Sequence, residues 1–206
     1  MKNDSIIFDL DGTLWDATPT SAVSWTEGLK SVGIHKTISV DDVKRVTGNP
    51  QNICIQMLLP QETQQFPHLI NLLSRYEEAA IREKGGSLYK GVQEGIVSLA
   101  NAFPLFIVSN CEGWYLDLFF RNSGLKKYFK DFDCFGSSNL AKSAMILQLL
   151  GKYDLKAAVY IGDTSTDEKA AHDAGIDFIH AKYGFGHTEK ETVACSSFRE
   201  IVARFI

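Results

Sequence analysis

The stretch Ser5-Ile-Ile-Phe-Asp-Leu-Asp-Gly-Thr-Leu14 constrains this chain more than any other part of it. Its apolar run predicts a buried strand that leads directly to Asp9 and Asp11 and then to a Gly-Thr turn. Because side chains alternate along a strand, residues two apart begin on the same side. Two carboxylates aimed at one small volume repel each other and are costly to remove from water. Their placement therefore indicates a bound cation or a carboxyl group that carries a proton for chemistry.

The bulk properties of the chain narrow its possible partners. Its 206 residues allow one good-sized core, or a core with a small second module. A net charge of −4 without any Lys/Arg run argues against a nucleic-acid partner. No stretch approaches the ~20 apolar residues that span a bilayer, and no apolar leader precedes the first strand. We therefore expect no membrane partner and a cytoplasmic location. The four cysteines form no CxxC pair, so no zinc site is expected.

Helical patterns alternate with short apolar runs from Val92 onward. Strands are expected at residues 104–109, 132–135, 157–161 and 177–181, the last being the final core strand, and helices at residues 92–102, 113–123, 141–150, 165–174 and 198–206. Gly124, Gly151 and Gly175 are expected to end three of these helices. The alternation predicts parallel βαβ units in an α/β fold, with a Rossmann-like three-layer core around a parallel sheet.

Residues 16–87 break this alternation with four helical patterns, at residues 22–32, 40–47, 51–59 and 68–84. Connections within α/β units are usually short, so a block of this length favours an inserted module over extra helices packed on the core. We therefore expect a catalytic core made of residues 1–15 and 88–206, and an inserted all-helical cap domain made of residues 16–87.

Polar residues follow several of the expected strands, where ligands gather in parallel sheets. The hydroxyl of Ser109 and the backbone N–H of Asn110 lie at a helix start and suit phosphate oxygens, although a simple helix cap is the alternative. Lys142 is expected at the start of a helix, where the helix dipole disfavours a positive charge, so a functional role is indicated. An ordinary surface lysine is the alternative interpretation. Asp163 and Asp167 would complete an oxygen-rich cage suited to Mg²⁺, or would simply cap their helix.

These positions together resemble the successive motifs of the haloacid dehalogenase (HAD) superfamily of phosphotransferases: Asp9-x-Asp11-Gly12-Thr13, Ser109-Asn110, Lys142 and Gly-Asp163-x3-Asp167. The resemblance covers nearly the whole chain, including the position of the helical insert. Ile107-Val-Ser-Asn-Cys111 and Tyr183-Gly-Phe-Gly186 are similar to the phosphoglycolate-phosphatase-like branch. Many relatives follow the motif lysine with proline, whereas Ser143 follows it here.

The resemblance implies a Mg²⁺-dependent phosphatase that acts on a small phosphorylated metabolite through an aspartyl-phosphate on Asp9. It implies that Asp11 serves as acid and then as base, and that Lys142 ties the nucleophile to the phosphate. The implied phosphate-binding positions are Gly12, Thr13, Ser109, Asn110 and Lys142, and the implied metal ligands are Asp9, Asp11 through its backbone carbonyl, Asp163 and Asp167. Dehalogenases of the superfamily lack an acid at the position of Asp11.

Several alternatives remain open at this point. A phosphoglycolate-like ester is the best-matching substrate, but a sugar phosphomutase of the β-phosphoglucomutase type and a pyrophosphatase share the architecture. A phosphate-binding regulatory protein is the non-enzyme alternative. Such proteins typically lose a nucleophile or a metal-binding acid, whereas Asp9, Asp11, Lys142 and Asp163 are all present here. The chain could be a monomer or a homodimer.

Overall fold

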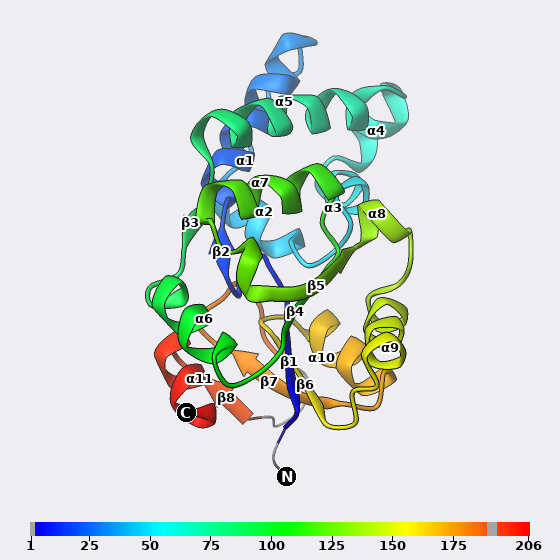
Figure 1. The fold of residues 1–206 in the computed structure, drawn as a ribbon. Helices are drawn as coiled ribbons and strands as arrows, with labels where there is room; N and C mark the ends of the chain where they lie inside the picture. The colour runs from blue at the N-terminus through cyan, green and yellow to red at the C-terminus, as the bar shows by residue number, and fades with distance from the viewer. Residues whose placement is uncertain (1–2, 189–192) are drawn as a thin grey trace.

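The computed structural model describes residues 3–188 and 193–206 (Figure 1). Residues 1–2 and 189–192, which belong to the expected core segments, lie outside the described residues. A six-stranded parallel sheet has the order β5-β4-β1-β6-β7-β8. Its strands are β1 (Ser5–Phe8), β4 (Leu105–Ser109), β5 (Phe129–Cys134), β6 (Ala158–Gly162), β7 (Asp177–Ala181) and β8 (Val193–Cys195).

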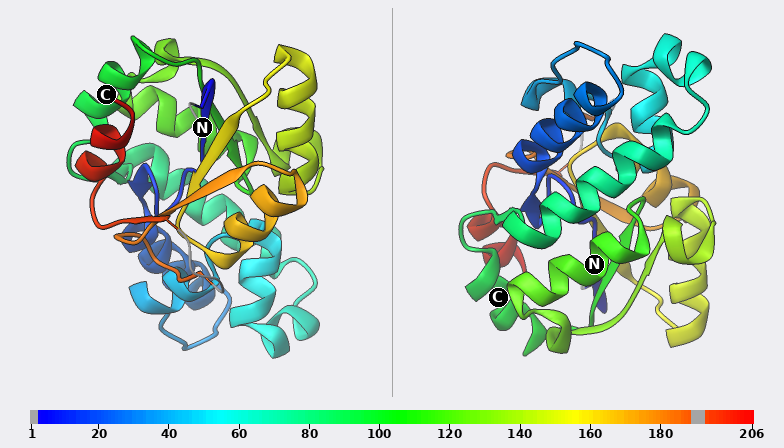
Figure 2. Two further views of the ribbon diagram at one scale, coloured as in Figure 1. Left: turned by 90° about the horizontal axis from the view of Figure 1, so that it is seen from below. Right: turned by 90° about the horizontal axis from the view of Figure 1, so that it is seen from above.

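Helices cover both faces of this sheet, so the expected three-layer α/β core is confirmed. Alternate residues of β1 serve different layers, because Ile6 and Phe8 pack into one apolar cluster and Ile7 packs into the other. The first cluster contains residues of α6 (Val92–Ala100), α7 (Gly113–Ser123) and α11 (Phe198–Phe205). The second contains residues of α9 (Lys142–Tyr153) and α10 (Ser165–Asp173). Figure 2 shows α11 and α9 on opposite sides of the sheet.

A helical block lies beyond the carboxyl ends of the strands, at the top of Figure 1. Its helices are α1 (Thr18–Ser31), α2 (Val40–Val46), α3 (Gln51–Leu58), α4 (Pro60–Gln65) and α5 (Leu69–Lys84). They share a buried apolar cluster of their own, which includes Trp25, Leu29 and Leu73. The chain enters and leaves the block through β2 (Trp15–Asp16) and β3 (Ser87–Leu88), which pair antiparallel. We propose that this ribbon marks the boundary of a cap domain over residues 16–87.

Two features of the block differ from the sequence-based expectation. Helix α1 begins at Thr18 instead of Ala22, because Oδ1 of Asp16 accepts hydrogen bonds from the backbone N–H and the hydroxyl of Thr18, at 2.8 and 2.6 Å. Helix α4 was not expected at all. It buries none of its residues, so it has no apolar periodicity that could predict it.

Three expectations about the core were also wrong at the ends of elements. Helix α9 continues through Gly151 to Tyr153, because Asp154 adopts the left-handed conformation that ends it (φ 53°). Strand β5 begins at Phe129 instead of residue 132, since its partly exposed residues do not form an apolar run. The strand over 177–181 is not the last one, because β8 follows it with two exposed residues and one buried residue. Among the described residues, no helix combines the length and apolar character needed to cross a bilayer.

Candidate active site

The fold brings the expected site residues to one edge of the sheet. Asp9 follows β1, Ser109 ends β4 and Asp163 follows β6. Since β1 lies between β4 and β6 and all three strands are parallel, their carboxyl ends meet. The three residues are almost completely buried, with exposed fractions of 1%, 3% and 0%. Buried polar groups at a strand edge need partners, and the partners here come from distant parts of the chain.

Three buried carboxyl groups form a candidate cation site. One carboxylate oxygen from each of Asp9, Asp163 and Asp167 lies within 4.8 Å of the other two. Oδ2 of Asp163 accepts a hydrogen bond from the backbone N–H of Phe185 at 2.7 Å, while its Oδ1 has no hydrogen-bond partner among the described residues.

The pKa values of these groups point to the same cation. Burial and the charge of Asp167 raise the pKa of Asp9 to about 6, and burial with the two neighbouring acids raises that of Asp163. A divalent cation would relieve this repulsion, and an unpartnered carboxylate oxygen is a ligand that Mg²⁺ prefers. The residues present therefore fit Mg²⁺.

The turn after β1 makes room for this site. Gly12 adopts a φ of +77°, and a Cβ atom at this position would lie 2.1 Å from Oδ2 of Asp163. Only glycine allows the turn to approach the acid so closely. Thr13 is buried, and its backbone carbonyl accepts a hydrogen bond from the Tyr183 hydroxyl at 2.8 Å. Both residues thus shape the turn.

Lys142 supplies the positive charge of the site. It is the first residue of α9, and its ammonium donates to Oδ1 of Asp9 at 2.9 Å and to Oδ1 of Asp167 at 2.5 Å. Burial opposes its charge, but Asp167 and Asp9 outweigh burial and raise the pKa of Lys142 above its ordinary value. An ammonium placed between two buried acids stays charged, and it offsets part of their repulsion. Its unfavourable position at a helix start therefore has a structural reason.

Asp167 is already fully engaged by the protein. Its Oδ1 accepts from Lys142, and its Oδ2 accepts from the hydroxyl of Thr164 at 2.6 Å and from the backbone N–H groups of Thr164 and Asp163 at 3.0 and 3.2 Å. This arrangement holds Lys142 and the loop after β6 in place. Asp163, whose Oδ1 lacks a partner among the described residues, is better placed to bind a metal directly.

The carboxyl group of Asp11 does not join the three acids. Its Oδ1 accepts a hydrogen bond from the hydroxyl of Tyr115 at 2.5 Å, and the same hydroxyl accepts one from Nε1 of Trp15 at 3.1 Å. Burial raises the pKa of Asp11 to about 8, although the hydrogen bond from Tyr115 works against this shift. This raised pKa favours the protonated form of the Asp11 carboxyl group. The expected ligand role of Asp11 concerns its backbone carbonyl and leaves this carboxyl group available for proton transfer.

The phosphate-binding pair expected after β4 faces the helical block. The hydroxyl of Ser109 accepts a hydrogen bond from the backbone N–H of Cys111 at 3.4 Å. The side-chain amide of Asn110 donates to the backbone carbonyl of Gly48 at 2.8 Å, so it ties the loop between α2 and α3 to the core. The side chain of Asn110 thus holds the two parts of the chain together, and phosphate binding by its backbone N–H stays a prediction.

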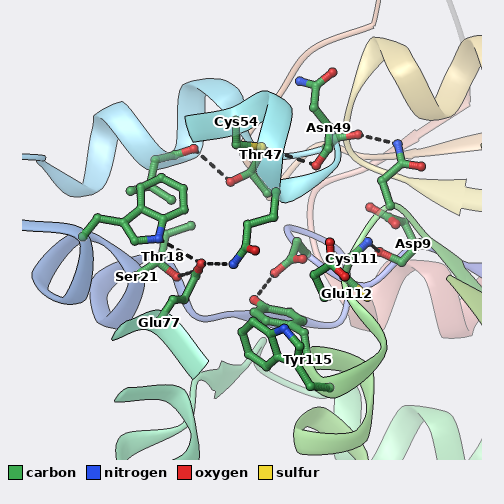
Figure 3. Close-up of a pocket in the computed structure, with 18 of the residues that line it drawn as sticks. Asp9, Thr18, Ser21, Thr47, Asn49, Cys54, Glu77, Cys111, Glu112 and Tyr115 are labelled. Atoms are coloured by element: carbon green, nitrogen blue, oxygen red, sulfur yellow. Dashed lines mark hydrogen bonds between the residues drawn. The ribbon is translucent and has the colours of Figure 1, made fainter. Parts of the chain in front are cut away.

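A pocket with about 60 Å³ of free space lies between the helical block and this edge of the sheet (Figure 3). The core contributes Asp9, Asp11, Ser109, Asn110 and Lys142 to its lining. The helical block contributes mainly uncharged side chains together with one carboxylate, that of Glu77. Tyr115 and Glu77 were missed by sequence reasoning, because an aromatic residue and an acidic residue in helical patterns look like core and surface, respectively.

Comparison with known proteins gives one consistent result. The family model described as haloacid dehalogenase-like hydrolase matches residues 6–181. A phosphoglycolate phosphatase of Vibrio cholerae is 30% identical over 89% of this chain and 86% of its own length, and that of Colwellia psychrerythraea is 28% identical over 91% and 88%.

Solved structures share the fold. A predicted phosphoglycolate phosphatase from Haemophilus somnus matches with a TM-score of 0.86 at 23% identity, and the match covers 100% of this chain and 99% of the other. A haloacid dehalogenase-like family protein from Streptococcus pneumoniae matches with a TM-score of 0.83 at 22% identity, and the match covers 99% of each chain.

Proposed function

This chain belongs to the haloacid dehalogenase-like hydrolase family, and we propose that it is a Mg²⁺-dependent phosphatase that forms an aspartyl-phosphate on Asp9. The observation that carries the proposal is the buried group of Asp9, Asp163 and Asp167 with Lys142 among them. The substrate would be a small phosphate monoester. Phosphoglycolate is the first ester to assay, because the curated relatives carry its name.

Asp9 is the nucleophile of the proposed reaction. Lys142 holds Oδ1 of Asp9 at 2.9 Å, so the other carboxylate oxygen attacks phosphorus. Asp9, Asp163 and the backbone carbonyl of Asp11 would hold the Mg²⁺ ion. When bound, the ion neutralises negative charge on the phosphoryl group and on the nucleophile. The hydroxyl of Ser109 and the backbone N–H of Asn110 would donate hydrogen bonds to phosphoryl oxygens.

Asp11 moves the protons of both half-reactions. In the first, its carboxyl group gives a proton to the alkoxide that leaves as the phosphorus–oxygen bond breaks. In the second, the resulting carboxylate takes a proton from the water that attacks the aspartyl-phosphate. This step releases inorganic phosphate and restores Asp9. The raised pKa of Asp11, about 8, supports its role as an acid at neutral pH.

The proposed cap excludes bulk water from this chemistry. The hydrogen bond between Asn110 and Gly48 joins the phosphate-binding loop to the loop between α2 and α3. Because the backbone N–H of Asn110 is also proposed to bind the phosphate, movement of the cap and binding of the phosphate are coupled through one residue. A closed cap keeps water away from the aspartyl-phosphate until the leaving group has departed.

Magnesium dependence tests the proposed function directly. Phosphate release should require Mg²⁺ and stop when the ion is chelated, and Mg²⁺ should raise the melting temperature of the wild-type chain. In Asp163→Asn, we expect Mg²⁺ affinity to fall at least about tenfold by calorimetry. Without Mg²⁺ the same variant should be no less stable than wild type, since one of three repelling acids is gone. Equal Mg²⁺ affinity in both proteins would exclude Asp163 as a ligand.

Tyr115→Phe tests the positioning of Asp11. The substitution removes the hydroxyl that holds the Asp11 carboxyl group, so protonation of the leaving group should suffer. We expect kcat for an alkyl phosphate to fall about tenfold. For p-nitrophenyl phosphate, whose leaving group needs no proton, kcat should fall far less. Equal losses with both esters would contradict a role of Tyr115 in protonating the leaving group and would place its effect in the hydrolysis of the aspartyl-phosphate, the step that both esters share, or in the fold.

A further inference from the structure

The cap side of the pocket contains a buried carboxylate without a positively charged partner among the described residues. Glu77 lies on α5 with an exposed fraction of 5%. Its oxygens accept hydrogen bonds from the hydroxyl of Ser21, from Nε1 of Trp25 at 2.9 Å and from Nε2 of Gln51 at 2.5 Å (Figure 3). All three donors are neutral, and burial raises the pKa of Glu77. A carboxylate offers about four acceptor sites, so one remains for a ligand.

The ionisable side chains that line the pocket are predominantly acidic. Its acidic lining residues are Asp9, Asp11, Glu77 and Glu112, and its one basic lining residue within the described part of the chain is Lys142. Lys142 is already paired with Asp9 and Asp167. A leaving group with a second negative charge would therefore approach Glu77 without any cation to receive it.

The two basic residues that precede the cap loop do not change this charge pattern. Arg45 is paired with Asp42 at 2.5 Å, and Lys44 lies 4.0 Å from Asp16. Both line a different hollow, between α2 and the loop after β6, and neither lines the pocket over Asp9.

We propose that the substrate is the phosphate ester of a small amino alcohol, whose ammonium group binds the carboxylate of Glu77. This inference rests on the proposed phosphatase function. Trp25 and Trp114 line the same pocket, and the faces of indole rings attract ammonium groups. The free space of about 60 Å³ has to take the phosphoryl group as well, so the leaving group is short.

Three esters with leaving groups of equal length separate the effects of charge: 2-aminoethyl phosphate, 2-hydroxyethyl phosphate and phosphoglycolate. For the wild-type chain with Mg²⁺, we expect kcat/KM for the ammonium ester to exceed that for the neutral ester at least about tenfold. Phosphoglycolate should rank last. This ranking needs no variant, so it remains a test even if a substitution at Glu77 prevents folding.

Glu77→Gln tests the residue itself, because glutamine keeps the size of the side chain and removes its charge. The preference for the ammonium ester over the neutral ester should fall to about onefold to threefold. The matched control is Glu78→Gln on the same helix, where the carboxylate is paired with Arg82 at 2.7 Å. This control should keep the wild-type preference.

The remaining outcomes distinguish a failure of this inference from a failure of the proposed phosphatase function. Equal losses for all three esters in Glu77→Gln would mean that Glu77 only holds α1, α3 and α5 together, which overturns the inference. A wild-type ranking led by phosphoglycolate or by the neutral ester also overturns it, yet leaves the phosphatase function standing. If the wild-type chain with Mg²⁺ releases phosphate from none of these esters and not from p-nitrophenyl phosphate, the proposed function itself fails.

Discussion

Asp9→Asn should abolish phosphate release without loosening the fold. An amide cannot attack phosphorus as a carboxylate does, so we expect kcat to fall at least about a thousandfold. Asparagine keeps the size of the side chain, and its amide oxygen can still accept the hydrogen bond from Lys142. Removal of one of three mutually repelling acids should leave the melting temperature without Mg²⁺ unchanged or higher. Phosphate-release kinetics and thermal unfolding measure the two effects.

A rapid-quench experiment tests the same residue by a second route. With a substrate labelled in the phosphoryl group, the wild-type chain should carry label on Asp9 during turnover, and Asp9→Asn should carry none. Intact mass should be checked first, because deamidation of asparagine would restore aspartate. Full activity in a variant of confirmed mass would place the nucleophile on another residue.

The parts of the site that sequence could predict share one property, because each follows a strong local signal. The apolar run before Asp9 predicts a buried strand, and parallel strands place their carboxyl ends at one edge. Lys142 is conspicuous because a lysine at a helix start opposes the helix dipole. The structure places its ammonium between Asp9 and Asp167, a position that explains the local penalty.

The residues that sequence missed depend on contacts over long separations. Tyr115 reaches Asp11 across 104 positions, and Glu77 reaches Ser21 across 56. A helical pattern shows which face is apolar, but it does not show which polar side chain is buried against another element. The end of α9 was wrong for a different, local reason: glycine favours the left-handed conformation that ends a helix, but here Asp154 adopts it and Gly151 does not.

Lys142→Met should cause the largest loss of stability of any single substitution considered. The variant keeps most of the side-chain volume but leaves Asp9 and Asp167 buried without their ammonium partner, beside the third buried acid, Asp163. Removing one partner from a buried ion pair costs about 3–5 kcal/mol in the free energy of unfolding. Urea denaturation without Mg²⁺ should show this loss. Saturating Mg²⁺ should restore part of it, because the ion binds only the folded chain.

The pH dependence of this loss has a definite sign. The pKa of Asp9 in the folded chain, about 6, lies above its unfolded value, so the folded state binds more protons and becomes less stable as pH rises through this value. The ammonium of Lys142 lowers the pKa of Asp9, so in Lys142→Met this pKa lies even further above its unfolded value. The stability difference between wild type and Lys142→Met should therefore be small at ~pH 5 and large at ~pH 8.

The matched control is Lys152→Met, on the same helix but exposed and paired with Asp131. This control should show little loss, and an equal, pH-independent loss in both variants would contradict the electrostatic role of Lys142.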